Sequence, residues 1–167
     1  MTEITECSCN NKVEYTFEQQ NVCKNCFLRL FKNRIKRALS EKKLRKDSIV
    51  LIENECAAQL VKEIIPLPLR IVSKANTYDA QIVTDTLDDE AIDFLEQLPS
   101  TDEKNVIKIF KYVSENEVIQ YATIKRYKFT PKPKNKFWKE FLDAFKKYPD
   151  MQNNLVRNIQ ELKKLKK

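Results

Sequence analysis

The 167-residue sequence contains no glycine, and this limits the functional sites that the chain can form. The P-loop and the dinucleotide-binding fingerprint both need glycine where backbone N–H groups approach phosphate closely. The chain also lacks histidine, which removes the commonest general base and every zinc site that uses imidazole. Nucleotide-driven catalysis of the usual kinds is therefore disfavoured, and cysteine, carboxylate and lysine side chains remain for chemistry.

Four of the five cysteines lie within the first 26 positions. Five cysteines, four of them close together in the sequence, form a poor disulfide framework but are typical of a metal site in a reducing compartment. Cys23 and Cys26 have the CxxC spacing that lets two thiolates bind one zinc ion, and Cys7 and Cys9, one residue closer, are the candidate second pair. We expect a structural zinc ion, because four thiolates leave no position for a substrate water. The alternative is buried thiols or a redox pair without metal.

Charge is segregated along the chain, which has a formal net charge of +7. Residues 24–46 hold ten lysines and arginines and one acid, whereas residues 75–103 hold nine acids and no base. Like charges one turn apart destabilise a helix, so the basic segment favours a polyanion such as RNA over a merely solvated face. The candidate phosphate contacts are Arg29, Lys32, Lys36 and Arg37, with Lys132 and Lys134 in a later basic segment.

That later segment also contains aromatic side chains, at Tyr127, Phe129, Phe137 and Trp138. Aromatic rings among lysines could stack on RNA bases. For Phe137 and Trp138, which begin an amphipathic helix, packing in the core is the favoured interpretation.

Hydrophobic periodicity predicts an α/β fold in which short apolar strands alternate with helices. Ser114 and Glu117 have the spacing of a capping box at a helix start. Alternation of this kind is typical of a mostly parallel sheet. We expect a cysteine-rich zinc lobe with a basic helix over residues 1–46, and an α/β domain with C-terminal helices over residues 47–167. The expected strands are 48–52, 69–72, 81–84 and 106–110, and the expected helices are 27–39, 54–64, 88–95, 114–125 and 137–165, the last broken at Pro149.

Two further candidates have simpler interpretations. Asp88 and Asp89 could bind Mg²⁺ or share a proton, but acids at a helix start more often serve as caps and dipole partners. Cys56 follows an expected strand, where an α/β enzyme places its active loop, yet a lone buried cysteine usually acts as a small hydrophobe. No apolar run approaches the length of a membrane span, and the first thirty residues lack a signal-peptide core. We therefore expect a soluble, cytoplasmic protein.

Five segments, in order, resemble the tRNA 2-thiolation proteins: "CKNCF", "DSIVLIE", "TDTLDDEAIDFLEQL", "IKIFKYVSENEVIQYA" and "FWKEFLDAFKKYPDMQNNLVRNIQEL". That family comprises adenylating enzymes of the N-type ATP pyrophosphatase class and their non-catalytic partner subunit. Residues 87–95 match the family pattern L-D-D-x-A-x-x-F-L, and Glu117, Tyr121 and Ala122 match its E-x-x-x-Y-A helix. The resemblance implies a reduced ATP-pyrophosphatase-like domain with the adenine nucleotide alpha hydrolase-like fold.

Departures from the family pattern indicate the non-catalytic type of subunit. Catalytic members carry S-G-G-x-D-S after the first strand, where this chain has an acidic, glycine-free turn at residues 53–58 that would repel ATP. The cysteines used for sulfur transfer or an iron–sulfur cluster are missing, and residues 130–133 read Thr-Pro-Lys-Pro. The resemblance thus implies a pseudoenzyme that binds no ATP, pairs with a catalytic subunit as a heterodimer and binds tRNA for wobble-uridine 2-thiolation. The alternatives are a zinc-stabilised RNA- or protein-binding module unrelated to thiolation, and a transferase using Cys56.

Overall fold

A computed structural model describes residues 7–18, 20–96 and 105–146 and shows an α/β fold. The final helix was expected to continue to Leu165, but residues 147–167 lie outside the described part. Among the residues described, no helix has the length and apolar character that a bilayer crossing requires. The elements are β1 (Tyr15–Phe17), β2 (Gln20–Val22), α1 (Lys24–Ser40), β3 (Ile49–Ile52), α2 (Glu55–Ile64), β4 (Arg70–Val72), β5 (Ala80–Val83), α3 (Leu87–Leu95), β6 (Val106–Lys108), α4 (Glu115–Lys125) and α5 (Lys136–Lys146).

Four strands form a parallel sheet in the order β4-β3-β5-β6. Strand β3 lies inside the sheet, where Val50 is paired with Ile71 of β4 and Ala80 of β5. Val50 is fully buried, as expected for an apolar, β-branched run with neighbours on both edges and both faces. The predicted parallel α/β architecture is confirmed.

Local capping fixes where the helices begin. Ser114 and Glu117 form the predicted capping box at the start of α4, and Thr86 and Asp89 form a second one at the start of α3. Each box satisfies two backbone N–H groups that have no partner within the helix. Asp88 accepts a hydrogen bond from the backbone N–H of Glu115 at 2.7 Å. The structural interpretation of Asp88 and Asp89 is therefore confirmed, since they join the starts of α3 and α4.

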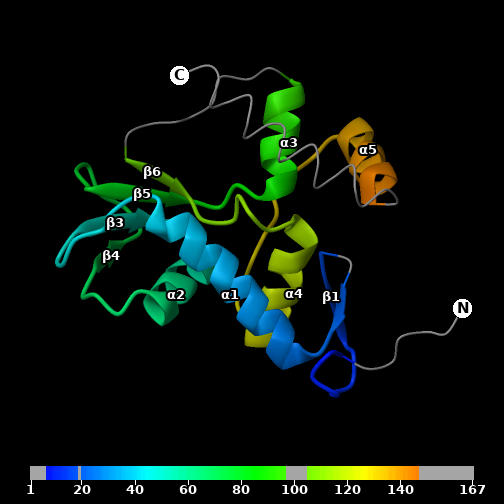
Figure 1. Ribbon diagram of the computed structural model, residues 1–167. Coiled ribbons are helices and arrows are strands. Elements are labelled where there is room, and N and C mark those ends of the chain that lie inside the picture. The colour runs from blue at the N-terminus through cyan, green and yellow to red at the C-terminus, as the bar shows by residue number, and fades with distance from the viewer. Residues whose placement is uncertain (1–6, 19, 97–104, 147–167) are drawn as a thin grey trace, which may run out of the picture.

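Helix α1 runs from the sheet to the β1–β2 hairpin (Figure 1). Its apolar stripe faces the core, where the Phe31 ring stacks on Tyr121 of α4 with centroids 4.3 Å apart. Phe27 and Ile35 are fully buried on the same face. Buried side chains from both sides of residue 46 belong to one hydrophobic core, so the cysteine-rich segment packs directly against the α/β domain.

The antiparallel hairpin of β1 and β2 was not predicted from the sequence. Phe17 is buried beneath it, and the backbone N–H of Glu18 donates to the Glu117 carboxylate at 3.1 Å. Arg34 interrupts the apolar stripe of α1, but it donates to the Tyr112 carbonyl at 2.7 Å and pairs with Glu18. These contacts hold the hairpin against α1 and α4.

The aromatic residues of the later basic segment divide into two groups. Tyr127 and Phe129 pack against the core, with Phe129 edge-on to Phe110 at 5.8 Å. The expectation that Phe137 is a core residue is wrong for the described part of the chain, because 64% of it is exposed. Trp138 is half-buried, and its indole N–H donates to Glu96 of α3. Helix α5 therefore lies beside α3 with Phe137 on its outer face.

Candidate metal centre and basic surfaces

The four N-terminal cysteines converge on one point. Their sulfur atoms all lie within 4.8 Å of one another, with Cys9 Sγ 3.5 Å from Cys23 Sγ and 3.6 Å from Cys26 Sγ. All four are free thiols rather than disulfides. Cys7, Cys23 and Cys26 are buried, whereas Cys9 is exposed. Four sulfur ligands this close together can bind a metal ion.

A tight turn brings Cys7 and Cys9 together despite their short spacing. The Asn10 N–H donates to the Cys7 carbonyl at 2.7 Å, and the Cys7 N–H donates to the Asn11 carbonyl at 2.9 Å. Asn10 takes a left-handed conformation with φ of 61°, which asparagine tolerates better than most residues other than glycine. The Asn11 side chain also donates to Cys9 Sγ at 3.2 Å. Sequence reasoning missed this contribution of the Asn-Asn pair.

The second cysteine pair lies at the start of α1. Cys23 is the N-cap residue of the helix and Cys26 is in its first turn. Backbone N–H groups of Cys9 and Cys23 lower the pKa of Cys7 to about 6. Hydrogen bonds to Cys9 and Cys7 raise the pKa of Cys26 to about 12. The group thus ionises in steps, and a bound cation would have to displace the Cys26 proton.

The candidate RNA contacts on α1 lie in different environments. Arg29 and Lys36 are exposed. Arg37 is exposed as well and stacks over the Tyr112 ring at 4.5 Å. Lys32 is half-buried and forms an ion pair with Glu63 at 2.8 Å. Arg29, Lys36 and Arg37 therefore present charge to solvent, while Lys32 also holds α1 against α2.

Lys132 and Lys134 both form ion pairs with carboxylates of the fold, but only Lys134 is covered. Lys134 is 6% exposed in its side chain and pairs with Asp89 at 3.0 Å and with Glu115. Lys132 pairs with the buried Asp85 while more than half of its own side chain remains exposed. The Lys134 ammonium is already neutralised and covered, so we leave Lys134 out of the surface proposed to bind RNA.

The turn between β3 and α2 lies where a parallel sheet usually binds ligands, at the carboxyl end of a strand. Asn54 caps α2 by accepting the Ala57 N–H at 3.1 Å. Glu53 and Glu55 flank it and are exposed. Cys56 follows in the core with no exposed surface. Burial, together with the charges of Glu55 and Glu63, raises the pKa of Cys56 to about 12, which is opposite to what a nucleophilic thiol requires.

A second acidic group lies near the carboxyl ends of β5 and β6. Carboxylate oxygens of Asp85, Glu90 and Asp93 lie within 4.8 Å of one another. The Lys108 ammonium is 3.6 Å from Asp85 and also pairs with Glu90, and Lys132 pairs with Asp85 as well. Two lysines thus form ion pairs with two of these three acids, and nothing further in the described residues points to a cation there.

Sequence and structure comparisons differ in what they find. No protein-family model matches the chain, and no curated protein sequence matches it. Among solved structures, the chain is similar to the U34-tRNA thiolase NcsA from Methanococcus maripaludis, determined with its [4Fe-4S] cluster. The TM-score is 0.64 at 16% identity, and the match covers 96% of this chain and 89% of that chain. This likeness concerns the fold, and the predicted α/β architecture is shared with that thiolase along nearly the whole chain.

Proposed function

We propose that the protein is a non-catalytic subunit of a tRNA wobble-uridine 2-thiolation complex, in which it binds tRNA and supports a catalytic, ATP-using partner. The observation that carries this proposal is the structural likeness to a U34-tRNA thiolase over 96% of the chain. The family-like segments at residues 87–95 and 117–122 form helices at the positions that the resemblance implied. Fold and sequence pattern thus favour the same family independently.

The β3–α2 turn supports the non-catalytic assignment. A phosphate cradle needs backbone N–H groups that face outward and lack nearby negative charge. Here the Asn54 side chain takes the N–H of Ala57, and the exposed carboxylates of Glu53 and Glu55 flank the turn. Cys56 is buried behind it. We therefore assign ATP binding and sulfur transfer to the partner subunit.

The cysteine group fits a single structural zinc ion. Zinc bound tetrahedrally at about 2.3 Å from each sulfur places those sulfurs about 3.8 Å apart, close to the distances from Cys9 to Cys23 and Cys26. An iron–sulfur cluster would hold its ligands further apart, because each cysteine sulfur binds a different iron atom. Bound zinc would contribute folding free energy and no chemistry, since four thiolates close its coordination shell. Its role would be to hold the start of the basic helix α1.

The test is the 2-thiouridine content of cellular tRNA after depletion of the protein. Thiolated tRNA is retarded in a mercury-containing gel, so loss of the retarded band would report loss of thiolation. We expect the wild-type chain and Cys56→Ala to restore the band equally, because Cys56 is a core residue. We also expect the catalytic subunit to co-purify with the chain.

Other outcomes would favour the alternatives. An unchanged band after depletion would contradict a role in thiolation and would favour a zinc-stabilised module with another RNA or protein target. Failure of a folded Cys56→Ala variant to restore the band would instead favour catalysis by this chain. The circular dichroism spectrum and melting temperature of Cys56→Ala distinguish a chemical defect from loss of the fold.

A further inference from the structure

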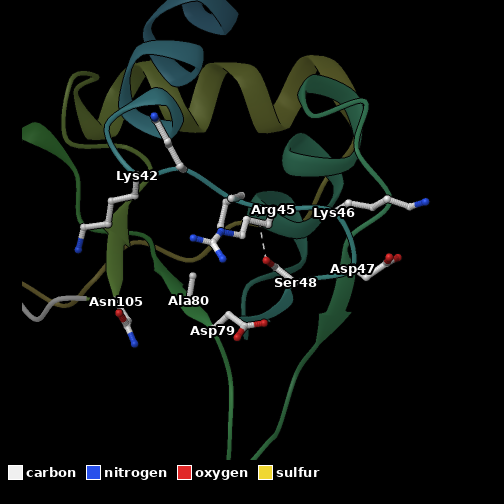
Figure 2. A pocket seen from close by; sticks show the side chains of 10 residues that line it. Lys42, Arg45, Lys46, Asp47, Ser48, Asp79, Ala80 and Asn105 are labelled. Carbon is white, nitrogen blue, oxygen red and sulfur yellow. Dashed lines mark hydrogen bonds between the residues drawn. The ribbon is translucent and has the colours of Figure 1, made fainter.

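A basic cleft lies at the amino-terminal edge of the parallel sheet, away from the β3–α2 turn. The loop after α1 forms one wall, and residues at or just before the starts of β3, β5 and β6 lie around it (Figure 2). Its volume is about 570 Å³, within the range of about 300–1,000 Å³ that is common for ligand sites. It is lined by Lys42, Lys43, Leu44, Arg45, Lys46, Asp47, Ser48, Asp79, Ala80 and Asn105.

The cleft is positively charged. Among the described lining residues, four cationic side chains, at positions 42, 43, 45 and 46, outnumber two carboxylates, those of Asp47 and Asp79, which gives a formal charge of +2. Asp79 is engaged with the backbone, because it accepts the Ile49 N–H at 2.7 Å. Within the described residues, no carboxylate forms an ion pair with Lys43 or Arg45. Among the described residues, the charges of Lys43 and Arg45 are therefore not neutralised by an ion pair.

Side chains rather than backbone groups supply the attraction. The N–H groups of Asp47 and Ser48 already donate to the carbonyls of Pro68 and Arg45, and the N–H of Arg45 donates to Ser48 Oγ, so these three groups are not available to a small phosphate. In Figure 2, Arg45 extends toward Ala80 and Asn105, whereas Lys46 points away. Cationic side chains without a backbone cradle suit the phosphates of a polymer, whose affinity comes from charge and counterion release.

The positive surface continues from the cleft onto α1. Lys36 is exposed one turn before the end of α1 at Ser40, and Arg29 is exposed two turns further back, about 10 Å along the helix axis. Together the loop and helix form an extended series of cations rather than an isolated spot. Such a series matches an extended polyanion better than a single free phosphate.

We propose that this cleft binds the phosphodiester backbone of RNA, with Lys43 and Arg45 as phosphate contacts and α1 continuing the same surface. The inference rests on the proposed tRNA-binding function and specifies where the RNA lies: at the amino-terminal edge of the sheet, opposite the edge that carries the β3–α2 turn. A subunit bound in this way positions tRNA while leaving its carboxyl edge out of RNA contact.

The test compares two double variants that remove equal charge. Lys43→Gln with Arg45→Gln removes two cations from the cleft. Lys62→Gln with Lys74→Gln, the control, removes two exposed lysines from α2 and from the loop after β4. Binding of the full chain to fluorescently labelled tRNA is measured by anisotropy at several salt concentrations. Melting temperatures show that both variants remain folded.

We expect the cleft variant to bind tRNA about tenfold more weakly at low salt. Each lost phosphate contact reduces the slope of log K against log salt by about 0.7–0.9, so the slope should fall by about 1.4–1.8. The control variant should keep the wild-type slope. Equal binding by the wild type and the cleft variant, or equal loss in both variants, would overturn the cleft while leaving RNA binding intact. Absence of tRNA binding by the wild type would contradict both the cleft and the proposed RNA role.

Discussion

Lys134 is the lysine for which a structural role and an RNA-binding role predict the most different results. Its ammonium is covered and pairs with Asp89 and Glu115, so Lys134→Gln leaves two carboxylates without their cation. Removing one partner of a buried pair costs about 3–5 kcal/mol. Glu115 is a quarter exposed, so water screens its interaction with Lys134. We therefore expect the lower end of this range, a loss of about 3 kcal/mol in the free energy of unfolding. For a chain of this size, that lowers the melting temperature by about 6–12 °C.

Urea unfolding followed by far-UV circular dichroism measures this loss. The matched control is Lys136→Gln, whose lysine is 89% exposed and pairs only loosely with Glu140 at 3.7 Å; it should change stability by less than about 0.5 kcal/mol. Adding Glu115→Gln to Lys134→Gln should cost less than adding it to the wild type, because the two positions interact. A loss below about 1 kcal/mol, or a tRNA salt slope that falls with Lys134→Gln, would refute the structural assignment.

The pH dependence of this pair has a definite sign. Burial alone disfavours the charged Lys134, but its hydrogen bonds to Glu115 and Asp89 outweigh burial and raise its pKa above the ordinary 10.5. A group whose pKa is raised on folding stabilises the protein fully below its unfolded pKa. The difference in stability between the wild type and Lys134→Gln should therefore be constant near neutral pH and shrink only as pH rises above about 10.5.

Three further results are expected. Metal analysis of the purified chain should find one zinc ion per molecule. The variant Cys9→Ser, which removes the exposed ligand, should lower both the zinc content and the melting temperature, and an unchanged zinc content in this variant would place the metal elsewhere. Burial opposes ionisation of Glu63, but hydrogen bonds from Lys32, Tyr127 and Lys125 outweigh it and lower its pKa to about 2. Glu63→Gln should thus cost about 1–2 kcal/mol at neutral pH, and the difference should fade as pH drops from about 4.5 toward 2; urea titrations that give the same difference at pH 7 and pH 3 would contradict this. Arg126 ends α4 in a left-handed conformation with φ of 59°, so Arg126→Gly should raise stability by about 0.5–1 kcal/mol and Arg126→Ala should not; equal melting temperatures for the two variants would count against it.

The sequence was sufficient to predict elements that depend on local contacts or on a clear hydrophobic pattern. The capping box at Ser114 and Glu117 needs contacts only three residues apart, and the apolar run of β3 can be recognised without its neighbours. The β1–β2 hairpin was missed because each strand has three residues and little alternation. What holds it is long-range: burial of Phe17 and the bond from Glu18 to Glu117, 99 residues away. The ion pairs of Lys134 could not be predicted for the same reason, since its partners Asp89 and Glu115 are distant in the sequence.

Among the described residues, the two edges of the sheet differ in how their charges are balanced. At the carboxyl edge, acids such as Asp85 and Glu90 are compensated by Lys108 and Lys132 of the same chain, while the exposed acids of the β3–α2 turn are left to repel an anion. The amino edge has the reverse pattern, because the cations of residues 42–46 exceed its carboxylates. Association of a polyanion is steered by such unbalanced surface charge. A nucleic acid that approaches this protein should therefore bind at the amino edge, because the acids at the carboxyl edge either form ion pairs within the chain or repel an anion.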